Sequence, residues 1–157
     1  MDILPGSQQD VYVLIILSLI SLYFLYRSSY RLLKGLQSKS WMKYRGTVLS
    51  VYLDQKHDEE GDAIFKPRVE FQYSVNGQIY TSKTLSYQPL SGYGYKAVFT
   101  HIDDISKGKD VDIYVNSANH RQAVIIPGVN NRNHLEFIIS ILAAAFLIYA
   151  LTLHLTF

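Results

Sequence analysis

Residues 67–85, PRVEFQYSVNGQIYTSKTL, decide the fold of the central part of the chain. Two runs of alternating polar and apolar residues flank Asn76-Gly77, and the first run places on one face Val69, Phe71, Tyr73 and Val75. In the second run, one face carries Gln78, Tyr80, Ser82 and Thr84, and the other carries Ile79, Thr81 and Lys83. Asn-Gly favours the two positive φ angles of a type I′ turn, which closes two-residue β-hairpins. The stretch therefore predicts a β-hairpin with one apolar face.

Shorter alternating runs lie on both sides of this hairpin. Residues 46–54, GTVLSVYLD, are rich in β-branched and aromatic residues and predict a strand, while the polar residues 55–65 predict a loop. Residues 111–116, VDIYVN, predict a strand that turns inward Val111, Ile113 and Val115. Residues 123–128, AVIIPG, predict a last short strand. The sequence thus indicates a β domain over residues 45–128, a small all-β barrel or sandwich of about five strands.

The first apolar run covers residues 11–26, sixteen residues without a charge. A span needs about 20 residues, and Arg27 and Arg31 can reach the interface and lengthen this one. A cleaved signal peptide is the alternative, but it requires a basic n-region and a small-residue cleavage site. The residues before the run contain no Lys or Arg, and RSSYRLLKG after it contains no A-x-A pattern. We therefore expect a retained transmembrane helix over residues 11–26.

The second apolar run lies within residues 135–157. Residues 137–157, FIISILAAAFLIYALTLHLTF, would form a helix about 32 Å long. A buried helix of a soluble core is the alternative, but such helices are usually shorter and keep a polar stripe. Here polar side chains appear only at Ser140 and, near the far end, at Thr152, His154 and Thr156. We predict a second transmembrane helix over residues 135–157, with Glu136 in its first turn.

Residues 27–44 connect the first span to the β domain and predict an amphipathic juxtamembrane helix. Its apolar side carries Leu32, Leu33 and Leu36, and Gly35 disfavours a continuous straight helix. Basic and amphipathic aromatic residues are typical of membrane interfaces. We assign to the interface Arg27, Arg31, Lys34 and Trp41.

The sequence offers no site for catalysis. There is no Cys, the five His residues are scattered, and nucleotide-binding and nucleophile motifs are absent. The acidic residues between Asp54 and Asp62 lack the D-x-D-x-D-G spacing of an EF-hand loop, so they indicate a solvated charge run. We predict no catalytic residue, no cofactor and no metal, and therefore a protein that is not an enzyme.

The segment after the hairpin is rich in aromatic residues beside Pro89, Gly92 and Gly94. Tyrosine is enriched at protein interfaces because it provides a large contact area at low entropic cost. The candidate partner-binding residues are Tyr87, Tyr93, Tyr95 and Phe99. The alternative is that these rings pack on the domain or rest on the bilayer.

Four motifs together resemble a known family: WxxYRGTV at 41–48, PxVxFxYxVxGxxY at 67–80, GxxVxIYVN at 108–116 and AVIIPG at 123–128. They resemble the DUF3592 family of small membrane proteins, in which hydrophobic helices frame a β domain. Family members often have two prolines after the third motif, where this chain has Ser117 and His120. The resemblance implies an architecture rather than an activity. Some small two-span bacterial proteins of this kind act as immunity proteins for secreted toxins, and the resemblance suggests that role as an expectation.

The expected function is a membrane-anchored, non-enzymatic binding module. Its partners would be the lipid bilayer and a protein, either a toxin or a subunit of a membrane complex. Nucleic acid is not expected, because the basic residues near Arg27 flank a hydrophobic helix. The expected location is the bacterial inner membrane.

Charge placement predicts the orientation. Asp2 and Asp10 precede the first span without any basic residue, while six Lys or Arg lie between Arg27 and Arg45. The positive-inside rule then places both termini outside and the β domain in the cytoplasm, with a periplasmic domain as the alternative. Alkaline phosphatase fused to the C-terminus should be active. Fluorescence at the same position from a reporter that works only in the cytoplasm would show the opposite orientation.

Overall fold

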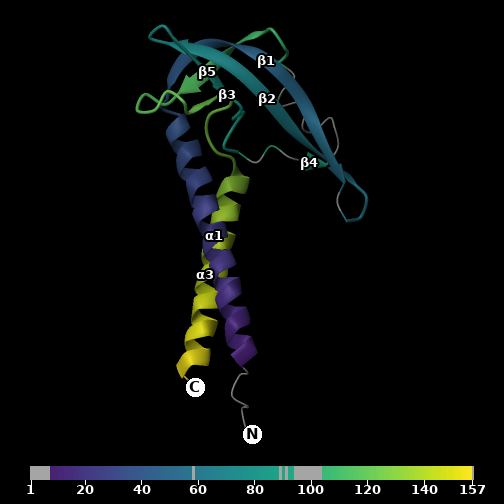
Figure 1. Cartoon of the computed structure of the whole chain (residues 1–157), viewed down its shortest axis with the longest axis vertical. Coiled ribbons are helices and arrows are strands. Elements are labelled where there is room, and N and C mark those ends of the chain that lie inside the picture. Colours follow the sequence, from purple (N-terminus) through teal and green to yellow (C-terminus); the bar gives the residue numbers. More distant parts are fainter. Residues whose placement is uncertain (1–7, 58, 89, 91, 94–103, 157) are drawn as a thin grey trace. The chain divides into compact units, whose positions relative to one another are not determined.

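The computed structural model describes residues 8–57, 59–88, 90, 92–93 and 104–156, and the chain divides into two compact units. One unit comprises Met1–Leu33 and Asn130–Phe157 and contains the second helix and most of the first; the other, Lys34–Val129, contains the sheet and the last residues of the first helix. Figure 1 labels these elements along the chain. Two helices therefore flank an antiparallel sheet, as the sequence predicted.

The sheet has six strands in the order β3-β2-β1-β5-β6, with β4 paired to β2. The strands are β1 (Met42–His57), β2 (Ala63–Val75), β3 (Gln78–Ser82), β4 (Gly92–Tyr93), β5 (Asp110–Val115) and β6 (Ala123–Val124). The sheet is open, so the barrel alternative was wrong. Edge strand β6 has only two residues, and beyond it the backbone amides of Ile125 and Ile126 donate to the carbonyl of Leu85, at 3.2 and 2.9 Å. Pro127 then has no N–H with which to continue a ladder.

The strands β1 and β2 are longer than the sequence indicated and form a curved two-stranded arm (Figure 1). Residues 55–65, predicted as a loop, are mostly strand, because the ladder continues to the pair His57↔Ala63. Gly61, at φ 90°, lies in the short turn between the strands. Polar side chains do not prevent pairing here, since the exposed face of an antiparallel sheet is solvated.

A β-bulge in β1 changes which residues face the core. Val48 pairs with Phe71, but the next pair is Ser50↔Glu70, so Leu49 is the extra residue. Because side chains alternate with a period of two, one inserted residue reverses the phase. The residues of β1 that face the core have even numbers up to Val48 and odd numbers from Val51 onward.

The hairpin was correctly predicted. Val75 pairs with Gln78, and Asn76 and Gly77 have φ angles of 52° and 78°. The apolar face of the first run is buried, and the inward residues of β5 join it. The core comprises Val48, Val69, Phe71, Tyr73, Val75, Leu85, Ile105, Val111, Ile113, Val115 and Ala123.

Tyr73 is the polar member of this core. Its hydroxyl donates to the backbone carbonyl of His120 at 2.6 Å, and its ring stacks on Tyr80 with centroids 5.7 Å apart. Burial raises the pKa of the Tyr73 phenol to about 12, and the neighbouring Tyr80 contributes in the same direction. The hydroxyl thus holds the 116–122 connection against the hairpin only while it keeps its proton.

The first helix, α1, covers Gln8–Ser38, and the second, α3, covers Asn131–Thr156. The amphipathic helix predicted over residues 27–44 is the end of α1 and stops at Ser38, because residues from Met42 pair with β5. Gly35 does not interrupt α1. A Cβ at Gly35 would lie 2.8 Å from the carbonyl oxygen of Gly128, and the adjacent Ser38 hydroxyl accepts a 2.8 Å hydrogen bond from the Gly128 amide.

Replacing Gly77 by Val should destabilise the sheet unit. A β-branched residue at φ 78° is strongly disfavoured, at a cost of about 1–2 kcal/mol or more. We expect limited proteolysis to cleave the variant within residues 63–85 while membrane insertion persists. The control Asn76→Gly should resist protease like the parent. Equal resistance of Gly77→Val would mean that the turn does not depend on positive φ.

The Tyr73 phenol should make stability depend on pH. The folded state binds the proton more tightly than the unfolded chain, whose tyrosine titrates near 10. Its contribution is therefore complete below pH ~10 and is lost as the pH rises through about 12. Urea unfolding followed by Trp41 fluorescence should show a steeper loss over this range in the parent than in Tyr73→Phe. The exposed control Tyr52→Phe should follow the parent, and identical slopes for all three would contradict the assignment.

Candidate functional site

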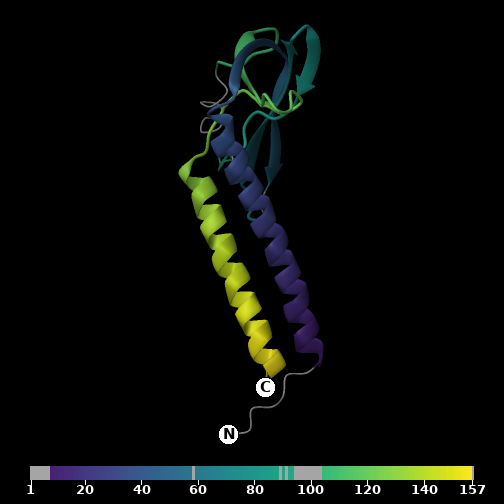
Figure 2. The same cartoon turned by 90° about the vertical axis from the view of Figure 1, so that its left-hand side faces the viewer.

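The two helices are long and apolar enough to span a membrane, over Asp10–Ser38 and Asn131–His154. Most side chains of both are exposed, which distinguishes them from the mostly buried core helix of a soluble protein. They run antiparallel, with Gln8 and Thr156 at the same end of the pair (Figures 1 and 2). The helix unit thus has the composition of a membrane anchor.

The covered positions of both helices follow a heptad spacing. Within residues 11–32 of α1 the covered side chains include positions 11, 14, 18, 21, 25, 28 and 32, and in α3 they include positions 133, 137, 140, 144, 147 and 151. Positions 29, 31, 136 and 150 are also partly covered. Alternating steps of three and four are typical of helices that pack at a shallow left-handed angle. Many of these residues are small, including Ser18, Ser21, Ser28, Ser140 and Ala144, as at helix interfaces in membranes.

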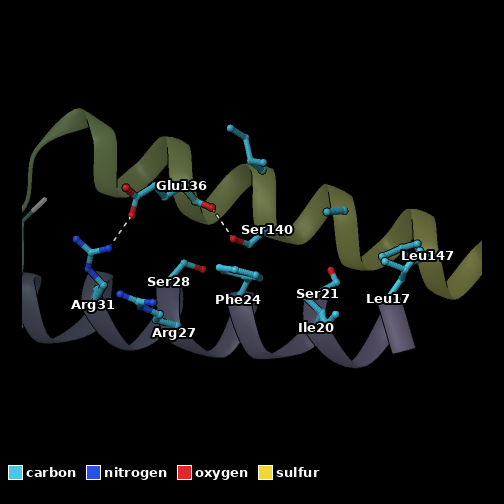
Figure 3. A pocket seen from close by; sticks show the side chains of 12 residues that line it. Leu17, Ile20, Ser21, Phe24, Arg27, Ser28, Arg31, Glu136, Ser140 and Leu147 are labelled. Atoms are coloured by element: carbon cyan, nitrogen blue, oxygen red, sulfur yellow. Dashed lines mark hydrogen bonds and ion pairs between the residues drawn. The ribbon is translucent and has the colours of Figure 1, made fainter. Parts of the chain in front are cut away.

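A groove of about 620 Å³ lies between α1 and α3 (Figure 3). Most of its length is apolar, lined by Leu17, Ile20, Phe24, Ile139, Ala143 and Leu147. One end is charged, where Arg31 Nη1 lies 3.1 Å from Glu136 Oε2 and Arg132 Nε lies 3.6 Å from Glu136 Oε1. Arg27 lines the same end and has no ion-pair partner among the described residues.

The serine hydroxyl groups along the groove differ in whether they have a hydrogen-bond partner. Ser18, Ser28 and Ser140 donate to backbone carbonyls of their own helix at 2.7, 3.1 and 2.6 Å. Ser21 is 7% exposed, and its hydroxyl has no hydrogen-bond partner in the described part of the chain. Figure 3 shows this hydroxyl pointing across the groove toward α3.

The residues predicted for the membrane interface have different surroundings. Arg27 and Arg31 lie at the charged end of the groove. Lys34 donates to the side chain of Gln122 at 2.9 Å, and Trp41 packs edge-to-face on Tyr87 with centroids 6.1 Å apart. Sequence reasoning missed the pairing of Arg31 with Glu136. The available signal was that two antiparallel spans bring the end of the first beside the start of the second.

The structure describes only some of the predicted partner-binding residues. Tyr87 is half-buried against Trp41, and the backbone of Tyr93 pairs with Ile64 as part of β4. Tyr95 and Phe99 lie outside the described residues. A partner-binding role of this segment therefore stays a prediction.

The outer face of the β1–β2 arm is a second candidate surface that the sequence did not reveal. We call it the arm face; around a shallow pocket of about 270 Å³ it comprises Ser50, Tyr52, Asp54, Arg68, Glu70 and Lys83. Tyr52 is 62% exposed and stands opposite Arg68 in the ladder. Arg68 pairs with Asp54 at 3.1 Å, and Lys83 lies 3.5 Å from Glu70. No group of three or more His, Cys, Asp or Glu able to hold a metal occurs among the residues that the structure describes.

These features define a class of protein in which two helices long and apolar enough to cross a membrane flank a small antiparallel sheet. The chain belongs to the family described as domain of unknown function (DUF3592), whose model matches residues 44–130. The match extends from Tyr44, near the start of β1, to the residue before α3, which confirms the resemblance carried by the four sequence motifs. No curated protein matches the chain.

Proposed function

We propose that this chain is a membrane-anchored, non-enzymatic protein-binding module and that the arm face contacts its partner. The observation that carries the proposal is an exposed aromatic side chain between two ion pairs, on a part of the sheet that the core does not require. Tyr and Arg are the residue types most enriched among the energetically dominant positions of protein interfaces. Tyr52 and Arg68 form such a pair on adjacent strands.

The arm is separate from the core in its packing. The buried core residues of β1 and β2 extend only to Val48 and Val69, and beyond them Pro67 is the one buried side chain of the described arm. Val51 and Leu53 are partly buried on the inner side, so the outer side is left to polar contacts. Substituting an outer residue should therefore change recognition more than stability.

The ion pairs of the arm face favour a partner with charges of both signs. Arg68 and Asp54 are 47% and 33% exposed, and Lys83 is 77% exposed. Exposed pairs of this kind add little stability, and they direct the approach and orientation of a charged partner. We expect association to slow as the salt concentration rises, since salt screens exposed charges.

Two kinds of partner fit a tethered module. One is a toxin that acts at the membrane, in which case the chain is an immunity protein; the other is a subunit of a membrane complex. In both cases anchoring at the bilayer raises the effective concentration of a partner that acts there. The proposed location is the bacterial inner membrane with the sheet unit in the cytoplasm. Protection of cells on co-expression with a toxin encoded beside the gene would distinguish the first kind.

Photo-crosslinking from the arm face tests the proposal in intact cells. A crosslinking amino acid at Tyr52 should give a discrete adduct with one protein, and the adduct should be lost when Arg68→Glu is added. The control position is Ile79 of β3, which is equally exposed at 63% but lies outside the arm face. Equal adducts from both positions would contradict a specific interface. A discrete adduct from Tyr93 and none from Tyr52 would transfer the interface to the tyrosine-rich segment.

A further inference from the structure

The groove between α1 and α3 is apolar along most of its length and cationic at one end. The charged end is lined by Arg27, Arg31 and the single carboxylate of Glu136, which leaves an excess of positive charge; Arg132, which also pairs with Glu136, is not part of the lining. Arg31 and Arg132 both pair with that carboxylate, while Arg27 does not. The groove end is therefore complementary to an anion.

Ser21 gives an independent indication that the groove takes a ligand. A hydroxyl buried in apolar surroundings without a partner loses its hydrogen bond to water and gains none in return. Serines in helices usually avoid this by donating to a carbonyl one turn earlier, as Ser18 does at 2.7 Å. Ser21 instead points into the groove (Figure 3), so its missing acceptor lies on the side where an occupant would be.

We propose that the groove binds one anionic glycerophospholipid. Its phosphate lies against Arg27 and Arg31, and its glycerol part passes Phe24. An acyl chain follows the apolar walls at and beyond Ser21, formed by Leu17, Ile20 and Leu147 (Figure 3). An ester carbonyl between the two accepts a hydrogen bond from the Ser21 hydroxyl. Arg27 and Ser21 are six residues apart, or about 9 Å along the helix, with the hydroxyl on the acyl side of the guanidinium.

Only a lipid supplies all three features in the observed order. A free phosphate would satisfy the arginines but leave the apolar length uncovered. A helix from a second copy would cover the apolar walls, but the one carboxylate within its residues 11–38 and 131–156 is Glu136, which already pairs with Arg31 and Arg132 of its own chain. Basic pockets between membrane helices are, in general, headgroup sites.

Native mass spectrometry of the full chain in detergent tests the proposal with two matched pairs of variants. Ala143 lines the groove and Ala145 does not, although both are exposed on α3. Ala143→Phe should fill the apolar part of the groove, while Ala145→Phe adds the same bulk outside the groove. Arg27→Gln removes a groove cation, and Arg132→Gln removes one that does not line the groove.

The parent should retain one phosphatidylglycerol through detergent exchange and should not retain phosphatidylcholine. Arg27→Gln should weaken retention about fivefold and Ser21→Ala measurably, while Ala143→Phe should abolish it. Ala145→Phe and Arg132→Gln should bind as the parent does. Circular dichroism checks that each variant keeps its helices, and Arg27→Gln remains decisive if Ala143→Phe unfolds.

Several results would overturn the proposal. Equal retention of both lipids, or equal retention by the parent and Arg27→Gln, would mean that lipid merely surrounds the helices. A dimer mass lost on Ala143→Phe would assign the groove to a second copy of the chain. Absence of any retained lipid in the parent would leave the groove without this ligand. Each outcome is independent of the arm face, since all four substitutions and Ser21→Ala lie in the helix unit.

Discussion

The pairing of β1 with two neighbours is the constraint on which the sheet unit depends. Residues 42–47 of β1 pair with β5, and residues 46–57 pair with β2, so the two ladders overlap only at Gly46 and Thr47. The core gathers around this overlap, where Val48, Phe71 and Ile113 are almost completely buried. The bulge at Leu49 follows directly and keeps an apolar inner face along the arm, because it shifts the phase once the β5 ladder has ended.

The helix unit is held together by other means. Apolar side chains gain little by leaving lipid for one another, so packing of small residues and polar contacts determine how helices associate there. The serines at the covered positions of α1 suit this, and the Arg31–Glu136 pair fixes one end at 3.1 Å. Because α1 and α3 have small side chains along their contact and charged side chains at one end, a groove lies between the two helices.

Local chemistry explains what could be predicted from the sequence. Asn76-Gly77 and the alternation from Val69 to Val75 are properties of adjacent residues, so the hairpin and its buried face were accessible. The end of α1 at Ser38 was not, since residues 42–44 join β1 only because β5 is available to pair with them. The arm extends through polar residues 54–57 for the same reason, and the arm face and the groove each combine residues that no sequence window brings together.

The β1–β2 arm is more regular than the stability of the sheet unit requires. A two-stranded ribbon is marginally stable in water, and its distal half has almost no buried core residue. The chain nevertheless holds it in register to His57↔Ala63 and pairs β4 with Ile64 and Phe65 near its end. Backbone hydrogen bonds in the arm bury few apolar side chains, but they fix the positions of the outer side chains. Tyr52 and Arg68 therefore need no further ordering of the backbone before a partner binds. Preorganisation of this kind lowers the entropic cost of association, which is the physical reason to seek recognition on the arm rather than over the core.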